Sequence, residues 1–444
     1  MHQLPLITGL DIFWSIIILL VIYSYSKTIT ANKIVFYPYY AFYTKGLMIK
    51  LFGGILFCLI YALYYKGGDT VHYYEGVVAM NKVFWEYPMD YFQILFLDGK
   101  DTVTTYAFWK VKTYPPIFML QDSRTFLVIK LTSILSIPSL NGFIATTILL
   151  AALVYNWIWK LYTFVAQRYP QHIKEANWSL LFLPSSVFWG SGIMKDTYTF
   201  AASCFAVYGL HQIVVERKFK LGTLFQLIFA IYLIITIKSY ILLAILPGLL
   251  LFANFERIRK IQSPVVKIVV LPLFTIGIFL ILNVIFSSGG DAFGKYSPDR
   301  ALEEASIQNQ DLKRDVYGSN SFDIGDYEPT LGGALSKFFP AVNAAIFRPY
   351  LWEVGSPTML FSALENAVIN ILSIIVLITG LGRFLKFVGS DPFFLFGLLF
   401  TLLLGFGIGL STANFGALVR YKIPFMPFYL FLILVARKSS KKIT

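Results

Sequence analysis

Five stretches of the sequence place charged or polar side chains beside an apolar run, where they can do chemistry. The first, 65-YKGGDTVHYYEG-76, carries Asp69 directly after a glycine pair that permits a sharp turn. A carboxylate at that place can accept a proton from a hydroxyl group or bind a divalent ion. The alternative is that Asp69 caps a helix. His72, in the same stretch, is a candidate for substrate binding. The alternative is that it is a hydrogen-bonded surface group.

The second stretch, 184-PSSVFWGSGIMKDTYTF-200, places Lys195 and Asp196 between two apolar segments. If a helix begins near Lys195, its free amides and its dipole favour a bound anion. The ammonium of Lys195 would add a point charge for a phosphate group. The alternative is an ordinary loop in which Lys195 and Asp196 pair with each other.

Three more stretches contribute cations. Lys238 lies inside about thirty apolar residues, so it must either snorkel to the interface or pair with an anion. Arg348, in 346-IFRPYLWE-353, suits bidentate phosphate binding, with anchoring by cation–π contact as the alternative. Arg420, with Asn414 upstream, lies at the start of the last apolar run and either binds phosphate or anchors the chain at the interface.

Ionisable groups at membrane depth are costly, so each of them is a functional candidate. If the helices bundle, these cations and carboxylates can surround one cavity. Such a cavity suits a lipid-anchored phosphate or diphosphate, and a nearby carboxylate suits activation of a hydroxyl nucleophile. That combination describes sugar transfer from a polyprenyl-phosphate donor, with the cations stabilising the charge on the leaving phosphate. The residues concerned are Asp69, Asp196, Lys195, Lys238, Arg348 and Arg420.

The composition shows what kind of scaffold must hold these groups. Of 444 residues, 57 % are hydrophobic and only 14 % are charged, and the mean hydropathy is +0.67. A soluble domain carries roughly 25 % charged residues, so most of this chain must use lipid as its solvent. The composition also excludes a disordered chain, a collagen and a disulfide scaffold. The net charge of +13 is best explained by cytoplasmic loops, and we expect no nucleic-acid partner.

Apolar runs of about 17–25 residues predict a single all-α, polytopic membrane domain over residues 1–444, with about eleven transmembrane helices. The run 177–191 is short and holds Pro184, which indicates a broken or re-entrant helix. Lys238 divides the long run 222–254 into two spans. The predicted spans are 8–25, 47–65, 140–165, 177–191, 196–214, 222–238, 239–254, 265–286, 357–380, 392–410 and 418–436.

Basic residues cluster in alternate connections, which orients the chain. By the positive-inside rule that side is the cytoplasm, so the N-terminus is outside and the C-terminus is cytoplasmic. The basic residues on that side are Lys27, Lys33, Lys45, Lys50, Lys160, Arg168, Lys174, Arg217, Lys218, Lys220, Arg257, Arg259, Lys260, Lys267, Arg383, Lys386, Arg437, Lys438, Lys441 and Lys442.

Two long segments are then external. The first, 66–125, carries aromatic, amphipathic stretches at 83–96 and 105–118, which are typical of helices that lie flat in the membrane interface. The second, 287–356, contains a polar helical stretch at 299–317 and an apolar stretch at 331–353. We find no internal repeat, which argues against a solenoid and against an inverted-repeat transporter.

The pattern resembles the polytopic glycosyltransferases with the GT-C fold. Members of that group have an acidic residue in the first external loop, directly after a span, followed by amphipathic helices; Asp69 and 83–118 match this layout. In the family the acidic residue follows the first span, so an extra N-terminal helix is expected here. PSSVFWGSGIMKD, FRPYLWE and NFGALVRYKIPFMP are similar to stretches of bacterial membrane proteins of polysaccharide clusters.

The resemblance implies a role for each candidate residue. Asp69 is the catalytic base or a metal ligand, and Lys195, Arg348 and Arg420 bind the lipid phosphate. Asp196 orients Lys195 or the acceptor. A divalent cation, Mg²⁺ or Mn²⁺, is compatible with the two carboxylates but is not demanded by them.

The sequence therefore predicts a membrane glycosyltransferase of cell-surface polysaccharide or glycoconjugate assembly. Its partners would be a polyprenyl-phosphate sugar, a glycan or glycolipid acceptor and the bilayer, with the active site facing the periplasm or exterior of a bacterial inner membrane. One alternative is an O-antigen-type polymerase or ligase that uses polyprenyl-diphosphate donors. Another is an anionic-lipid transporter or flippase, and a third is a non-catalytic assembly subunit.

Overall fold

The structure, a computed structural model, describes residues 6–259, 298–314 and 320–438. It is 81 % helical, and the described residues contain no β-strand. Seven of the described helices are long and apolar enough to cross a membrane, or eight if a bent pair near the C-terminus counts as one span. The prediction of an all-α membrane helix bundle is therefore confirmed.

The chain forms two compact units, and each is described by itself. The first comprises residues 1–168 and 186–201, and the second comprises 169–185 and 202–444. The helices of the first unit are α1 (Gly9–Ile34), η1 (Pro38–Phe42), α2 (Tyr43–Leu59), η2 (Ile60–Tyr65), α3 (Asp69–Glu86), α4 (Pro88–Ile94), α5 (Thr102–Lys110), α6 (Ile117–Gln121), α7 (Ser123–Ser136) and α8 (Phe143–Arg168). Two helices belong partly to each unit: α10 (Pro184–Trp189) and α11 (Lys195–Leu210).

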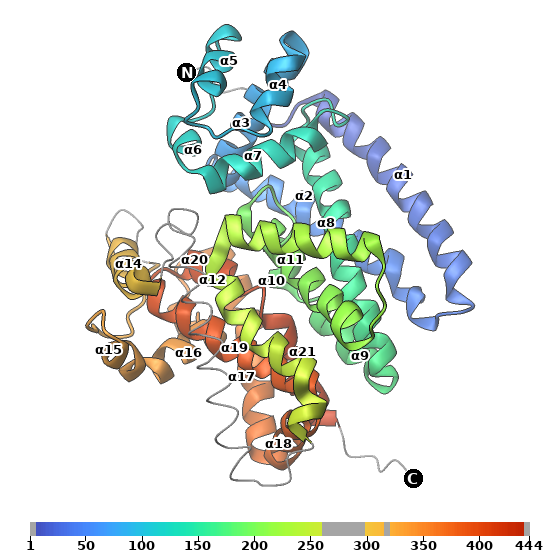
Figure 1. Ribbon diagram of the computed structural model, residues 1–444, viewed down its shortest axis with the longest axis vertical. Coiled ribbons are helices and arrows are strands. Elements are labelled where there is room, and N and C mark those ends of the chain that lie inside the picture. Colours follow the sequence, from blue (N-terminus) through green and yellow to red (C-terminus); the bar gives the residue numbers. More distant parts are fainter. Residues whose placement is uncertain (1–5, 260–297, 315–319, 439–444) are drawn as a thin grey trace. The chain divides into compact units, whose positions relative to one another are not determined.

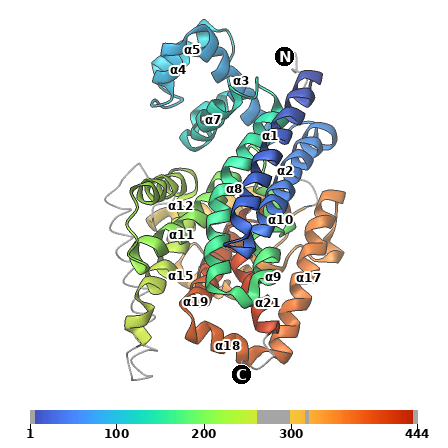
Figure 2. The same cartoon turned by 90° about the vertical axis from the view of Figure 1, so that its right-hand side faces the viewer.

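The core of the first unit is made by α1, α2 and α8, which lie side by side (Figure 2). Asp11, near the start of α1, is 4 % exposed and accepts hydrogen bonds from the amides of Ile144 and Ala145, both at 3.0 Å. It thereby satisfies free amides at the beginning of α8, which helix geometry alone leaves unpaired. Helices α3 to α7 form a separate group beyond these spans (Figure 1).

In the second unit α19 is the central helix, and it contacts α12, α14, α16, α18 and α21. Glycine at several α19 positions lets neighbouring helices approach closely. The helices of this unit are η3 (Pro170–His172), α9 (Ile173–Ala176), η4 (Asn177–Leu181), η5 (His211–Val215), α12 (Leu221–Arg259), α14 (Pro298–Leu312), α15 (Leu331–Ser336), α16 (Phe338–Phe347), η9 (Leu351–Glu353), α17 (Pro357–Thr379), α18 (Leu381–Ser390), α19 (Pro392–Ser411), α20 (Phe415–Tyr421) and α21 (Met426–Lys438).

The candidate spans agree with several of the predicted apolar runs. They are Gly9–Ile34, Pro38–Tyr65, Phe143–Arg168, Lys195–Val215, Leu221–Asn254, Pro357–Thr379 and Pro392–Ser411, with α20 and α21 as the bent pair. The predicted span 265–286 lies outside the described residues. The total of eleven spans and the orientation of the chain stay predictions.

Two long apolar runs are irregular. The run 177–191 consists of the π-helical turn η4 and the short α10, divided before Pro184, so the prediction of a broken helix there is confirmed. The run 222–254 is one helix, α12, in which Lys238 has non-helical φ and ψ of −144° and 72°. Lys238 therefore marks a kink inside α12 at the place where the sequence predicted a break between two spans.

Two basic residues are not where the orientation argument put them. Lys45 and Lys50 lie within α2 rather than in a connection between spans. Lys50 is 3 % exposed, and its ammonium donates to the carbonyl oxygens of Ser186, at 3.2 Å, and Gly190. The carbonyl of Ser186 also accepts from the amide of Gly190 at 3.2 Å, so Lys50 adds a second hydrogen bond at the end of α10. Lys50 thus has a structural role that its place between Lys45 and an apolar run did not reveal.

Candidate functional site

The last apolar run of the chain is broken close to its start. Helices α20 and α21 meet at an angle of 72°, and Pro424, which lacks a backbone N–H, lies in the break. The side chain of Asn414 caps α20 by accepting from the amides of Gly416, at 2.8 Å, and Ala417, at 3.3 Å. A broken helix is tolerated at membrane depth only where protein or a cavity covers its backbone. The groups around α20 are therefore the first to examine for function.

Lys422 lies in this break and is 1 % exposed. Its Nζ donates to Oδ1 of Asn366 at 2.7 Å, to the carbonyl of Arg348 at 3.2 Å and to the carbonyl of Ile346 at 3.4 Å. Its charge is also attracted by Glu365 of α17. Lys422 thus ties the α20–α21 break to α17 and to the chain that leaves α16.

Arg348 follows α16 directly and forms a bidentate pair with Glu353. Its Nε donates to the two carboxylate oxygens at 2.9 and 3.2 Å, and its Nη2 contacts Oε1 as well. The guanidinium also lies 4.8 Å from the ring centroid of Phe322 and 5.4 Å from that of Phe415 in α20. The cation–π anchoring considered for Arg348 is therefore present. A phosphate bound here would share the guanidinium with Glu353.

Two further cations belong to the same region. Lys238, at the kink of α12, is 7 % exposed, and its Nζ lies 4.0 Å from the ring centroid of Tyr421. Lys238 is thus buried by protein, which argues against snorkelling to the interface. Arg420 is half-buried in the last turn of α20. We call Lys238, Arg348, Arg420 and Lys422 the α20 cluster, because each lies in α20 or its break or contacts an α20 ring.

Glu365 was not among the sequence candidates, although it lies inside the apolar run that forms α17. Its Oε2 accepts a hydrogen bond from the backbone amide of Ser185 at 2.6 Å. A carboxylate within a predicted span is a functional candidate by the same cost argument that singled out Lys238. The signal was therefore present in the sequence, as a carboxylate inside the predicted span 357–380 rather than near its outer end.

In the first unit, Asp69 is the first residue of α3 and is exposed. The sharp turn before it is confirmed, since Gly67 and Gly68 have φ of 159° and 101°. Gly68 is the capping residue, and its carbonyl accepts from the amides of Val71 and His72. Asp69 is thus one residue past the capping position considered for it, which leaves its carboxylate in the first turn of α3.

His72 lies on the surface of α3. Its Nδ1 is 3.2 Å from a carboxylate oxygen of Glu75, and both side chains are exposed. The edge of its ring packs on Phe118 at a centroid distance of 5.3 Å. These contacts match the role of a hydrogen-bonded surface group, which was the alternative to substrate binding.

Lys195 is the first residue of α11, as the sequence predicted for a helix start, but its ion-pair partner was not predicted. Its Nζ lies 2.7 Å from Oδ2 of Asp122, the capping residue of α7. Burial disfavours the charged carboxylate of Asp122. The charge and hydrogen bond of Lys195, with hydrogen bonds from Thr125 and the amide of Arg124, outweigh this effect and lower the pKa of Asp122 to about 2. Asp196 is 3 % exposed in the first turn of α11.

The sequence-predicted residues therefore fall into two groups. Asp69, His72, Lys195 and Asp196 belong to the first unit. Lys238, Arg348, Asn414 and Arg420 belong to the second unit and gather around α20. The four predicted binding residues of the second unit thus come together from three distant stretches of sequence.

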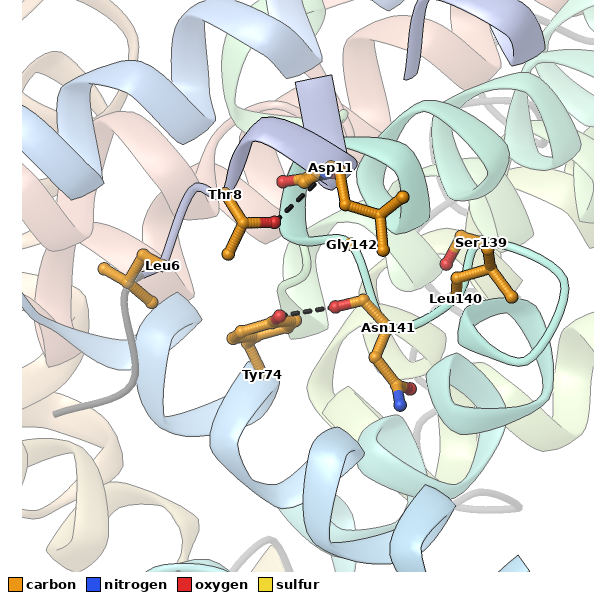
Figure 3. A pocket seen from close by; sticks show the side chains of 9 residues that line it. Leu6, Thr8, Asp11, Tyr74, Ser139, Leu140, Asn141 and Gly142 are labelled. Carbon is orange, nitrogen blue, oxygen red and sulfur yellow. Dashed lines mark hydrogen bonds between the residues drawn. The ribbon is translucent and has the colours of Figure 1, made fainter. Parts of the chain in front are cut away.

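A hollow of about 140 Å³ lies in the first unit, beside the start of α8 (Figure 3). Its polar lining residues are Thr8, Asp11, Tyr74, Ser139 and Asn141. The hydroxyl of Tyr74 donates to the carbonyl of Asn141, and the carboxylate of Asp11 already accepts from two α8 amides. No sequence-predicted site residue lines this hollow, and its carboxylate serves the fold.

The carboxylates were also considered as ligands of Mg²⁺ or Mn²⁺. Within the described ranges, no three His, Cys, Asp or Glu side chains come together as a metal site. The chemistry proposed below uses no metal.

Comparison with known proteins adds no family name. No protein-family model, no curated protein and no solved structure matches this chain. The functional argument therefore depends on the residues themselves.

Proposed function

We propose that this chain is an integral membrane glycosyltransferase that takes its sugar from a polyprenyl-phosphate donor at the outer face of the membrane. The observation that carries the proposal is the α20 cluster. Four cations from three distant stretches of sequence gather at a break in the last span. Several cations brought together at membrane depth favour a lipid-anchored phosphate.

In the proposed reaction, the bond between the anomeric carbon and the phosphate oxygen breaks while a hydroxyl of the acceptor attacks that carbon. The leaving phosphate keeps the electron pair, and Arg348 and Arg420 stabilise its charge. The proton of the acceptor hydroxyl passes to a carboxylate. We propose Asp69 for this role on the family resemblance alone; it is an exposed residue of the first unit, so its part in the reaction is proposed separately from that of the α20 cluster, which belongs to the second.

A second candidate function is transport of an anionic lipid. The kink at Lys238 and the break between α20 and α21 interrupt two apolar helices, and Lys422 and Lys238 are buried beside them. Transporters place interrupted helices and buried charges at their binding sites. A polymerase or ligase is the chemically close alternative within the transferase class, and it would prefer a diphosphate.

The test is a thermal-unfolding titration of the purified protein with undecaprenyl phosphate, undecaprenyl diphosphate and phosphatidylglycerol. A ligand that binds only the folded state stabilises it by about 2.7 kcal/mol at one hundred times its dissociation constant. We expect undecaprenyl phosphate to stabilise the protein more than phosphatidylglycerol does. Arg420→Gln should lose this selective effect, whereas Arg314→Gln, a change at an exposed arginine outside the cluster, should keep it.

Three outcomes separate the candidate functions. A stronger response to the diphosphate favours the polymerase or ligase. Equal responses to phosphatidylglycerol and the polyprenyl lipids favour the transporter, as does movement of labelled lipid across proteoliposomes without transfer of sugar. For the transferase, Asp69→Asn should abolish sugar transfer while leaving undecaprenyl-phosphate binding intact. Full activity of Asp69→Asn would remove Asp69 from the mechanism.

A further inference from the structure

The helix α18 differs from the other long helices of the second unit in the burial of its side chains. It has ten residues, and none of them is buried. An isolated helix shorter than about 12 residues is marginal in water, so packing of an apolar face normally stabilises it. Its contacts with α19 and α21 leave one side of α18 open, and the surroundings of that side need an account.

The sequence of α18 separates apolar from polar residues. Leu381, Phe384, Leu385 and Val388 recur at helical spacing and share one face. Arg383, Lys386 and Ser390 lie on the opposite face by the same spacing, beside Phe387, which packs on Phe394 of α19. Phe384 and Val388 are half-buried, whereas Leu381 is 45 % exposed and Leu385 59 % exposed, so one edge of the apolar face is open. A short helix with this division is typical of one that lies in the membrane interface.

The neighbours of α18 indicate which surface covers it. It joins the candidate spans α17 and α19 and lies across the ends of α19 and α21 (Figure 2). Arg383 donates to the carbonyls of Thr379, at 3.2 Å, and Ala436, at 3.0 Å, which are at the ends of α17 and α21. This contact fixes α18 at the end of the spans.

The exposed apolar surface of α17 also continues into α18. Ile374, Leu377 and Ile378 are 53 %, 61 % and 78 % exposed on α17, and Leu381 and Leu385 follow on α18. Since α17 is apolar and long enough to span a bilayer, its exposed side chains face lipid. The continuity of the two surfaces argues that the same lipid covers α18.

Cations at this end of the spans select the kind of lipid. Lys386 of α18 and Arg437 at the end of α21 are exposed, and among the described residues neither has a carboxylate partner. Lys438 is exposed too, although it pairs with Glu175 at 2.8 Å. Basic residues beside a membrane surface attract anionic headgroups.

We propose that α18 is an interfacial helix that inserts Leu381 and Leu385 into the bilayer and binds the headgroups of anionic phospholipids through Lys386 and Arg437. This surface is independent of the α20 cluster and of the proposed transferase activity. It lies at the end of the chain's spans that the positive-inside rule assigns to the cytoplasm.

Membrane insertion is tested with an environment-sensitive label on the full chain in nanodiscs. The native Cys58 and Cys204 are fully buried, so an introduced cysteine takes the label. Nitroxide-bearing lipids should quench a label at Leu385→Cys to the same degree as one at Leu377→Cys on α17. A label at Ser390→Cys, on the polar face, should be quenched less. Equally weak quenching of the labels at Leu385 and Ser390 would overturn insertion. Insertion would also be overturned if the shielding of the Leu385 label depended on the number of protein molecules per disc.

Anionic selectivity is tested by the ratio of phosphatidylglycerol to phosphatidylcholine that the protein retains from mixed nanodiscs, measured by mass spectrometry. Each cation near a membrane surface contributes about fivefold to the binding of anionic lipid. We expect Lys386→Gln and Arg437→Gln each to lower the retained ratio by about that factor. Lys100→Gln, at an exposed lysine of the other unit, should not change it. An unchanged ratio in the double variant would overturn the headgroup site.

Discussion

The close approach of α16 to α19 supports a prediction in which one substitution has opposite effects at two positions. A Cβ atom at Gly409 of α19 would lie 2.1 Å from the carbonyl oxygen of Ala341 in α16 and 2.5 Å from its carbonyl carbon. A Cβ atom at Gly407, two residues earlier on the same helix, would have no neighbour within 4 Å. Gly409→Ala and Gly407→Ala therefore form a matched pair.

The magnitudes follow from what each methyl group meets. Extra carbon in a packed interior costs about 1–3 kcal/mol. The atoms beside Gly409 are backbone atoms that cannot rotate away, so we expect a loss near the upper end of that range. At Gly407 the same change removes glycine from a helix interior, which stabilises by about 0.5–1 kcal/mol. The two variants should thus shift the unfolding midpoint in opposite directions.

The assay is thermal unfolding of both purified variants in the same detergent, followed by the undecaprenyl-phosphate titration. Because α16 leads directly into Arg348, displacing it from α19 should also weaken binding of the lipid phosphate. Gly407→Ala should bind as the wild type does. Equal unfolding midpoints for the two variants would refute the close packing of α16 on α19, and with it the positioning of Arg348 by that contact.

Two other predictions concern buried or partly buried charges. Lys422→Met should destabilise the protein by about 3–5 kcal/mol, because it removes one partner of a buried, hydrogen-bonded charge; Lys45→Met, at an exposed lysine, should change the unfolding midpoint little, and similar midpoints would contradict the burial of Lys422. Lys195 contributes to lowering the pKa of Asp122 from 3.8 to about 2, so this pair stabilises the folded state above pH 4 and loses that effect as the pH falls toward 2. Asp122→Asn should flatten the acid limb of a melting-temperature profile against pH, and an unchanged limb would contradict the ion pair.

The sequence predicted the long apolar helices well and their contacts poorly. The predicted runs 357–380 and 392–410 match α17 and α19 within one residue at each end, because the length of an apolar run is a local property. The kink at Lys238 was also located, since a charge interrupts the run there. The start of α2 was less accurate, because the helix begins at Tyr43 and includes Lys45, where the sequence predicted a connection.

The sequence did not predict the partners of the charged residues, because these partners also lie far apart in the chain. Asp122 pairs with Lys195 across 73 residues, and the amide of Ser185 reaches Glu365 across 180. Neither partner lies in a motif with a fixed spacing, so only the packed helices bring them together. The gathering of the second group of candidates around α20 is likewise a tertiary result that the separate stretches did not predict.

The interrupted helices α12 and α20 contact each other through Lys238 and Tyr421. This contact helps to decide whether Lys238 and Lys422 serve only to anchor the chain. Lys238 lies at the kink of α12 and is placed over Tyr421, the last residue of α20 before the second break. Anchoring lysines keep their ammonium groups in water at the ends of regular helices. Lys238 and Lys422 are instead 7 % and 1 % exposed beside interrupted backbone, where burial of a charge is costly unless it is compensated. The oxygens of Ile346, Arg348 and Asn366 compensate this cost for Lys422. Anchoring does not require two lysines buried at one place, whereas the proposed phosphate site would use them.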